Sequence, residues 1–394
     1  MAVDLTALAD GSTGWGPPMR AAFTELDGAK LEVAAAQSGY APQRPGLVQW
    51  RKARAAMPTA VARVLCVGDS ITEGGLSFSV TARWTSVLSG LISARYAVPT
   101  STLGYLTPYM GVVSTVNPLT VTNGAAQSNW GVSCGNGALL TASTGKITGT
   151  VTGTSLNIYY LKTTSTATFT VKVDGVQVGG AYGGTAGTIT DGFVQAVAMG
   201  AAGSHTIEID AGAGSVYING ISVLNGNETT GLQMFNAGYS GALAVKFAVP
   251  NSVAWWQQAL AAVSPHLVIL MWNANDYAGA TSLATYQSNL DAIIANIRTG
   301  VVAQPQPSIL LVTPPKIAYT STQQWETYTH AMRTAAKKDG SAEFFDLGSL
   351  MPDIGSTAGT ASGYYSADPT HPNAAGHARM AQILDLVLGD QVVV

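Results

Sequence analysis

Charged side chains are scarce in this chain of 394 residues, where Asp, Glu, Lys and Arg together make up only 10%. An ordinary soluble domain carries about 25%. The 22 acidic and 19 basic residues nearly balance, with a net charge of −3. Because binding to nucleic acid or to anionic lipid depends on an excess of basic side chains, neither is an expected partner.

Cysteines and long apolar runs are also scarce. Cys66 and Cys134 lie in unrelated segments, so a disulfide framework is not expected. No apolar run approaches the roughly 20 residues of a membrane span, and the first residues lack the basic start and apolar core of a signal peptide. The histidines show no metal-ligand spacing, so no metal site is expected, and His377 on the last predicted helix is expected to have a packing role.

A polar turn directly after an apolar run is the first functional signal. The run Val64–Cys66 predicts a buried strand, and Gly68-Asp69-Ser70 predicts the sharp turn that ends it. In α/β folds, ligands bind at the carboxyl edge of the sheet, where Ser70 would then lie. Such turns are common in proteins, so this motif alone does not identify a catalytic serine.

The second signal is a polar loop before the last amphipathic helix. His371 precedes a proline, which favours an extended backbone in that loop, and Asp368 lies three residues earlier. A serine hydroxyl becomes a nucleophile only with a base to accept its proton, and the base needs a partner that sets its tautomer. Ser70, His371 and Asp368 could fill these three roles.

Two further turns could donate hydrogen bonds to a developing oxyanion. They are Asn236–Gly241 and Asn273–Asp276, and each follows an apolar run. Strands of a parallel sheet end at one edge, so both turns should lie beside Ser70. Glycine lets its backbone N–H approach a ligand closely, and the asparagine amide is a good side-chain donor.

These four segments, in this order, resemble the blocks of the SGNH/GDSL hydrolase superfamily of serine esterases. The resemblance implies that Ser70 is the nucleophile and that Asp368 and His371 complete the triad. It also implies that the N–H groups of Ser70 and Gly238 and the Asn275 amide form the oxyanion hole. The triad chemistry requires no cofactor.

Two positions depart from the superfamily pattern. Ile71 replaces the leucine of the GDSL name, and Asn273 stands where the third block usually begins with glycine. Asparagine tolerates left-handed backbone better than most residues. Tyr239, Tyr277 and Asn273 adjoin the motif residues and are candidates for lining the substrate pocket.

Strands and helices alternate through residues 49–104 and 229–394, which predicts a parallel sheet covered by helices on both faces. With the resemblance, this is the α/β, flavodoxin-like fold of an SGNH hydrolase. Residues 105–228 instead show short alternating strands and frequent glycine turns, which predict an inserted all-β sandwich or jelly roll. Within it, Tyr105, Tyr109 and Trp130 could stack on a sugar ring or belong to the core.

The opening residues 1–48 read as an attachment segment and linker. Their Asp-Gly-Ser-Thr-Gly-Trp-Gly-Pro-Pro run resembles the N-terminal segments of bacteriophage tail proteins. The resemblance implies other tail proteins as partners, a homotrimer as one assembly, and a virion or extracellular location reached without a signal peptide. A plain flexible tail is the alternative. A chain that begins near Arg51 would then keep full activity.

The expected function is hydrolysis of an ester, with an acylated polysaccharide of a bacterial host or a small ester as substrate. Two alternatives stay open. One is a receptor-binding tail module that holds a glycan with little turnover. The other is a cellular lipase or thioesterase, although no apolar acyl channel is evident in the sequence.

Overall fold

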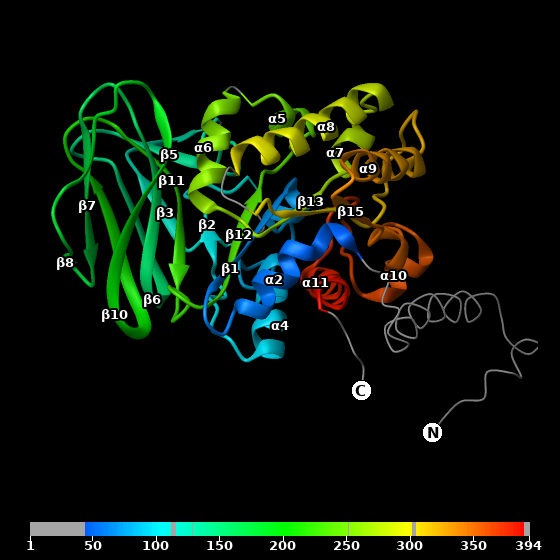
Figure 1. The fold of residues 1–394 in the computed structure, drawn as a ribbon, viewed down its shortest axis with the longest axis horizontal. Helices are drawn as coiled ribbons and strands as arrows, with labels where there is room; N and C mark the ends of the chain where they lie inside the picture. Colours follow the sequence, from blue (N-terminus) through cyan, green and yellow to red (C-terminus); the bar gives the residue numbers. More distant parts are fainter. Residues whose placement is uncertain (1–43, 112–115, 128, 251, 302–304, 390–394) are drawn as a thin grey trace, which may run out of the picture. The chain divides into compact units, whose positions relative to one another are not determined.

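The computed structural model describes residues 44–111, 116–127, 129–250, 252–301 and 305–389 (Figure 1). Residues Pro45–Asp385 form one compact unit. Residues 1–43 of the predicted attachment segment lie outside the described residues.

A five-stranded parallel sheet forms the centre of the hydrolase fold, in the order β12-β1-β13-β14-β15. Its strands are β12 (Gly231–Gly238), β1 (Val61–Gly68), β13 (Leu267–Met271), β14 (Ser308–Val312) and β15 (Ala342–Phe345). Every neighbouring pair is parallel. The three central strands are almost wholly buried, as expected for apolar runs that are covered on both faces. The predicted α/β architecture is confirmed.

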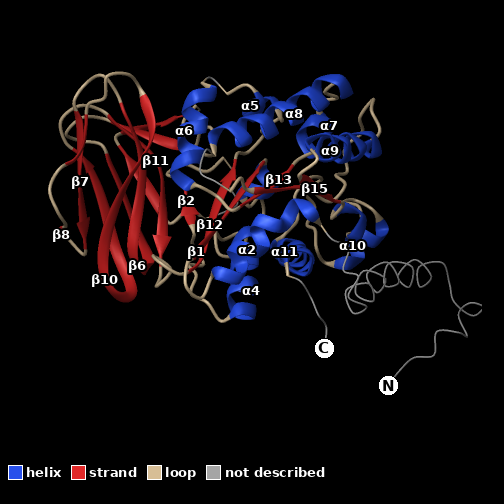
Figure 2. Ribbon diagram, viewed as in Figure 1, coloured by secondary structure: helices blue, strands red, loops and turns tan. Residues whose placement is uncertain are grey.

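Helices cover both faces of this sheet (Figure 2). Figure 1 shows α2, α4 and α11 on one face and α6, α8 and α9 on the other. The longer helices are α2 (Val48–Ala56), α4 (Trp84–Tyr96), α6 (Val253–Val263), α8 (Leu283–Gly300), α9 (Trp325–Asp339) and α11 (Ala374–Leu388). The shorter ones are α3 (Ser70–Glu73), α5 (Val245–Ala248), α7 (Ala274–Ala278), α10 (Thr357–Ser362), η2 (Pro45–Leu47) and η3 (Gly348–Leu350).

A ten-stranded antiparallel sheet lies between α4 and β12 in the sequence. Two long strands organise it, β6 (Lys146–Lys162) and β10 (Thr190–Ala211). The others are β2 (Tyr105–Leu106), β3 (Leu119–Thr122), β4 (Gly124–Gln127), β5 (Gly137–Leu140), β7 (Ala167–Val173), β8 (Val176–Gln177), β9 (Tyr182–Gly184) and β11 (Val216–Leu224).

The strand pairing of this region differs from the two separate sheets of a sandwich. One half of β6 pairs with β3 and the other half with β11, while β10 follows β6 over nearly its whole length. Hydrogen bonding is therefore continuous across the region. Side chains from both halves of β6 and β10 share one hydrophobic cluster, so the sheet has a core of its own.

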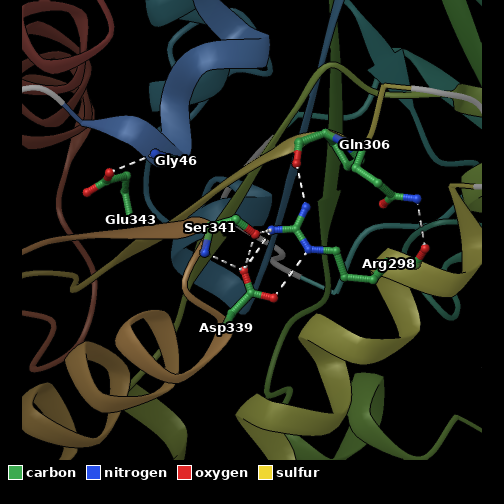
Figure 3. Close-up of polar contacts among 7 residues, drawn as sticks. Gly46, Arg298, Gln306, Asp339, Ser341 and Glu343 are labelled. Carbon is green, nitrogen blue, oxygen red and sulfur yellow. Dashed lines mark hydrogen bonds and ion pairs between the residues drawn. The ribbon is translucent and has the colours of Figure 1, made fainter.

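The hydrolase fold begins earlier than residue 49, where the sequence placed its boundary. Leu47 and Trp50 are only 2% and 1% exposed. The Trp50 N–H donates to Ser308 Oγ at 3.1 Å. The Gly46 N–H donates to Glu343 Oε1 at 2.9 Å, as Figure 3 shows. Residues 45–48 are thus part of the fold and not of a linker, because they are anchored on β14 and β15.

Arg298 fixes the amino ends of the same two strands (Figure 3). Its guanidinium donates to Asp339 Oδ2 at 2.8 Å, to Ser341 Oγ at 2.9 Å and to the Pro307 carbonyl at 2.7 Å. Gln306 Nε2 donates to the Arg298 carbonyl at 3.1 Å. These contacts lie at the edge of the sheet opposite to Ser70, so we assign them a structural role.

Candidate active site

Ser70 stands where the sequence predicted, at the carboxyl end of β1 and the first position of α3. Asp69 precedes it as the N-cap, and its Oδ1 accepts the Ile71 N–H at 2.9 Å. Burial raises the pKa of Asp69 to about 7. As the first residue of the helix, Ser70 has an N–H without an acceptor inside the helix, so this N–H is available to a bound anion.

The structure brings Ser70, His371 and Asp368 together in one hydrogen-bonded chain. His371 Nε2 lies 2.8 Å from Ser70 Oγ, and His371 Nδ1 lies 3.0 Å from Asp368 Oδ1. The same carboxylate oxygen accepts the backbone N–H groups of Thr370 at 2.7 Å and His371 at 2.6 Å. Because a carboxylate can only accept, Nδ1 carries the imidazole proton, and Nε2 is free to accept the proton of Ser70.

Gly238 is not available as an oxyanion donor, contrary to the prediction. Its N–H already donates to Asn236 Oδ1 at 2.9 Å. A Cβ on Gly238 would lie 2.1 Å from the Glu73 nitrogen, so glycine is needed there for the close approach of β12 to α3. This residue has a packing role.

A second glycine in the same turn has a free N–H. Gly241 is exposed, with φ of +73°, and its N–H has no acceptor among the residues that the structure describes. The neighbouring Ala242 carbonyl accepts from Asn275 Nδ2 at 3.1 Å, which leaves the second amide hydrogen of Asn275 available. The sequence motif Asn236–Gly241 contained both glycines, but the direction of their N–H groups could not be read from it.

Asp276 holds this turn in place. Its Oδ2 accepts the Ala244 N–H at 2.8 Å, and burial raises its pKa to about 6. Asp276 therefore ties the loop after β13 to the turn after β12.

Asn273 is fully buried and therefore cannot line the pocket as predicted. Its Oδ1 accepts the Tyr286 hydroxyl at 2.6 Å. Its φ of 142° is a backbone region that favours glycine, which explains why the superfamily pattern has glycine here.

The two tyrosines beside the motifs have different environments. Tyr277 is buried against Trp325, and its hydroxyl donates to the Tyr319 carbonyl at 3.1 Å, so its predicted place in the pocket is wrong. Tyr239 is half-buried, with Lys246 Nζ 3.8 Å from its ring centroid. Tyr239 remains a candidate for contact with substrate.

Glu73 is a site residue that sequence reasoning missed, although it lies within the quoted serine motif. It is buried, and its Oε1 accepts from the Gly111 N–H and from Asn136 Nδ2, both at 2.8 Å. Both donors belong to the region of the antiparallel sheet. Burial raises the pKa of Glu73 to about 7. This carboxyl therefore joins the nucleophile helix to residues far away in the sequence.

Replacement of Glu73 by Gln should change the dependence of stability on pH. An ordinary Glu titrates at 4.5 and Glu73 at about 7, so between these values the folded protein holds a proton that the unfolded chain has lost. This contribution to stability disappears as pH rises through about 7. Between pH 5 and pH 8, the melting temperature should fall less in Glu73→Gln than in the wild type. The difference should be roughly 2 °C for each kcal/mol of folding free energy that no longer depends on pH. Parallel falls in both proteins would contradict the raised pKa.

Neither a metal site nor a membrane helix is present in the described part of the chain. Across those residues, no three His, Cys, Asp or Glu side chains are grouped so that they could hold a metal ion. No helix there has the length and apolar character needed to cross a bilayer.

A serine hydroxyl bonded to an imidazole and a carboxylate, at the carboxyl edge of a parallel α/β sheet, defines a serine hydrolase. The sequence profile of the GDSL-like lipase/acylhydrolase family matches residues 223–379. Residues 223–379 are therefore similar to this family of acylhydrolases, and the chain is a carboxylic ester hydrolase. The matched range includes His371 but not Ser70, because the antiparallel sheet separates Ser70 from the later blocks.

Three solved structures match this chain at low sequence identity, and only the first of them has a TM-score that indicates the same fold. A peptidoglycan O-acetylesterase is 18% identical with a TM-score of 0.64, over 86% of this chain and 94% of that chain. An aryl esterase from M. smegmatis is 12% identical with a TM-score of 0.40, over 82% and 96%. A family two carbohydrate esterase from Clostridium thermocellum is 14% identical with a TM-score of 0.32, over 70% and 99%. No curated protein matches the sequence.

Proposed function

We propose that this ester hydrolase removes small acyl groups, such as acetyl, from polysaccharides of a bacterial surface. The hydrogen-bonded chain of Ser70, His371 and Asp368 carries the assignment of ester hydrolysis. The substrate class is supported by the likeness of the fold to a peptidoglycan O-acetylesterase over most of both chains.

In the proposed mechanism, Ser70 Oγ attacks the ester carbonyl while His371 Nε2 accepts its proton. Asp368 stabilises the imidazolium, which then donates the proton to the departing sugar oxygen, so that the sugar leaves with a free hydroxyl. Water then attacks the acyl-enzyme carbonyl while His371 Nε2 accepts a proton from it. The imidazolium returns this proton to Ser70 Oγ as the acid leaves. The N–H groups of Ser70 and Gly241 and the Asn275 amide would hold the oxyanion, and a single donor of this kind contributes about 10²–10³-fold to kcat.

Acyl-chain profiling separates this proposal from its alternatives. We expect kcat/KM for nitrophenyl esters to fall from acetate to longer chains, and acetate to be released from O-acetylated envelope polysaccharide. A preference for long chains would favour the lipase or thioesterase. Binding to the polysaccharide without release of acetate would favour the receptor-binding module. Polysaccharide that has been de-O-acetylated with mild alkali is the control for specific release.

We further propose that residues 105–228 are an inserted β-domain that contributes to polymer recognition. Gly111 lies directly against the Asn236–Gly241 turn, since a Cβ on Gly111 would be 2.5 Å from Ser240 Cβ. Of the three aromatic residues considered as sugar platforms, Tyr105 and Trp130 are buried and Tyr109 is partly exposed. Tyr109, two residues before Gly111, is therefore the candidate for contact with the polymer.

Replacement of Tyr109 by Ala should lower kcat/KM on O-acetylated polysaccharide by about 3- to 10-fold, the equivalent of about 0.5–1.5 kcal/mol for a lost aromatic contact. Turnover of nitrophenyl acetate should change less than twofold. Tyr109→Phe is the matched control, because it removes only the hydroxyl that donates to the Gly124 carbonyl at 3.1 Å. Equal losses on both substrates would point to a structural role.

We also propose that residues 1–43 attach the enzyme to a phage tail or to copies of itself. The resemblance of this segment to tail proteins supports the proposal. Sedimentation of the full chain should give an oligomer, such as a trimer, and a chain that begins at Arg44 should sediment as a monomer. Identical sedimentation would argue against attachment between copies, and co-sedimentation with purified virions would then decide on the tail.

A further inference from the structure

A second histidine is buried behind the catalytic loop. His377 lies on α11 and is fully buried. Its Nε2 lies 2.8 Å from the Gly75 carbonyl, and its Nδ1 accepts the Trp84 N–H at 3.3 Å. Because a carbonyl can only accept, Nε2 carries the proton. Burial lowers the pKa of His377 to about 4, so the ring is neutral and makes one donated and one accepted hydrogen bond.

Gly75 connects this buried ring to the catalytic one. A Cβ on Gly75 would lie 2.5 Å from His371 Cδ2 and 3.1 Å from His371 Nε2. The backbone of Gly75 therefore packs directly on the imidazole, next to the nitrogen that faces Ser70. The hydrogen bond from His377 holds the carbonyl of this same residue.

The segment that contains Gly75 is strained and needs support from outside. Leu76 and Phe78 both have left-handed backbone, with φ of 59° and 62°. Such conformations cost about 1–3 kcal/mol each and persist only where surrounding structure imposes them. The hydrogen bond from His377 is one such restraint, and it acts at the residue that touches His371.

We propose that His377 is a positioning residue for the catalytic imidazole: it fixes the Gly75 carbonyl, and Gly75 in turn fixes the ring of His371 against Ser70. The proposal rests on the proposed triad. A small displacement of a catalytic group can cost about 10²-fold in rate, because the reacting atoms leave the geometry of attack.

The test compares His377→Leu and His377→Gln on nitrophenyl acetate. Leucine removes both hydrogen bonds, and we expect kcat to fall 10- to 100-fold with KM within twofold. Glutamine can both donate and accept, and we expect it to keep at least a third of the wild-type kcat. Assays are run at a temperature at which circular dichroism shows each variant to be folded.

His266 offers a matched control at the opposite edge of the sheet. Burial lowers the pKa of His266 as well, and His266 Nδ1 accepts the Arg63 N–H at 3.0 Å. His266→Leu should lower the melting temperature and leave kcat unchanged. If His377→Leu lowers kcat no more than His266→Leu, the positioning role is wrong.

Gly75→Ala provides a second arm in case His377→Leu does not fold. The alanine Cβ must displace the His371 ring, so kcat should fall at least 10-fold while His377 is intact. Wild-type kcat in Gly75→Ala would overturn the proposal. Activity that survives in Ser70→Ala would instead overturn the triad, so the two failures are distinguishable.

Discussion

Replacement of Ser70 by alanine should lower kcat for nitrophenyl acetate by at least about 10⁴-fold, since loss of the nucleophile in serine hydrolases costs up to about 10⁶. Ser70 Oγ forms the covalent bond to the ester carbonyl in the first step, and His371 Nε2, which accepts its proton, lies 2.8 Å from it. The residual rate would come from the oxyanion donors and substrate binding alone. Initial rates with active-site titration of the wild type measure the effect.

The fold should survive this change. Ser70 is 4% exposed, and alanine keeps the first position of α3 without adding volume. Ser89→Ala is the matched control, because Ser89 is also buried and lies on α4, away from the triad, where its hydroxyl contacts Thr100 Oγ1 at 2.7 Å. That variant should lose about 1 kcal/mol of stability and no activity. More than 1% of wild-type activity in Ser70→Ala would contradict the assignment of the nucleophile.

Removal of residues 1–50 should unfold the enzyme or lower its melting temperature by more than about 10 °C. The deletion takes away Leu47 and Trp50, and loss of a buried tryptophan alone costs about 3–5 kcal/mol out of a total stability of about 5–15 kcal/mol. This reverses the expectation from sequence that a chain beginning near Arg51 keeps full activity. A chain beginning at Arg44 retains both residues and should keep the wild-type melting temperature and turnover.

Point variants in the full chain separate this packing effect from any effect of the N-terminal segment. Trp50→Ala should reproduce most of the destabilisation, whereas Val48→Ala should cost under about 1 kcal/mol, because Val48 is 44% exposed. Urea denaturation gives the free energy of unfolding for each variant. Equal stability of the chains that begin at Arg44 and Arg51 would show that the packing of η2 and α2 on the sheet is dispensable.

Local sequence was sufficient where the chemistry of a residue and its position after a strand decide the outcome. Gly-Asp-Ser after an apolar run placed Ser70 at the sheet edge, and Asp368 and His371 lie close enough in sequence to meet within one loop. The parallel sheet followed from buried apolar runs that alternate with helices. These features depend on short-range patterns, so they could be predicted.

Which polar groups are free and which side chains are buried depends on contacts between segments that are distant in the sequence. Gly238 and Gly241 look equivalent in the sequence, yet the N–H of Gly238 is bonded to Asn236 and that of Gly241 is free. Glu73 contacts Asn136, which is 63 positions away in the sequence, and Trp50 contacts Ser308, which is 258 positions away. The amino-acid sequence sets the chemistry that is available at each position. The direction of an N–H and the burial of a side chain depend on packing between distant segments, which no local pattern encodes.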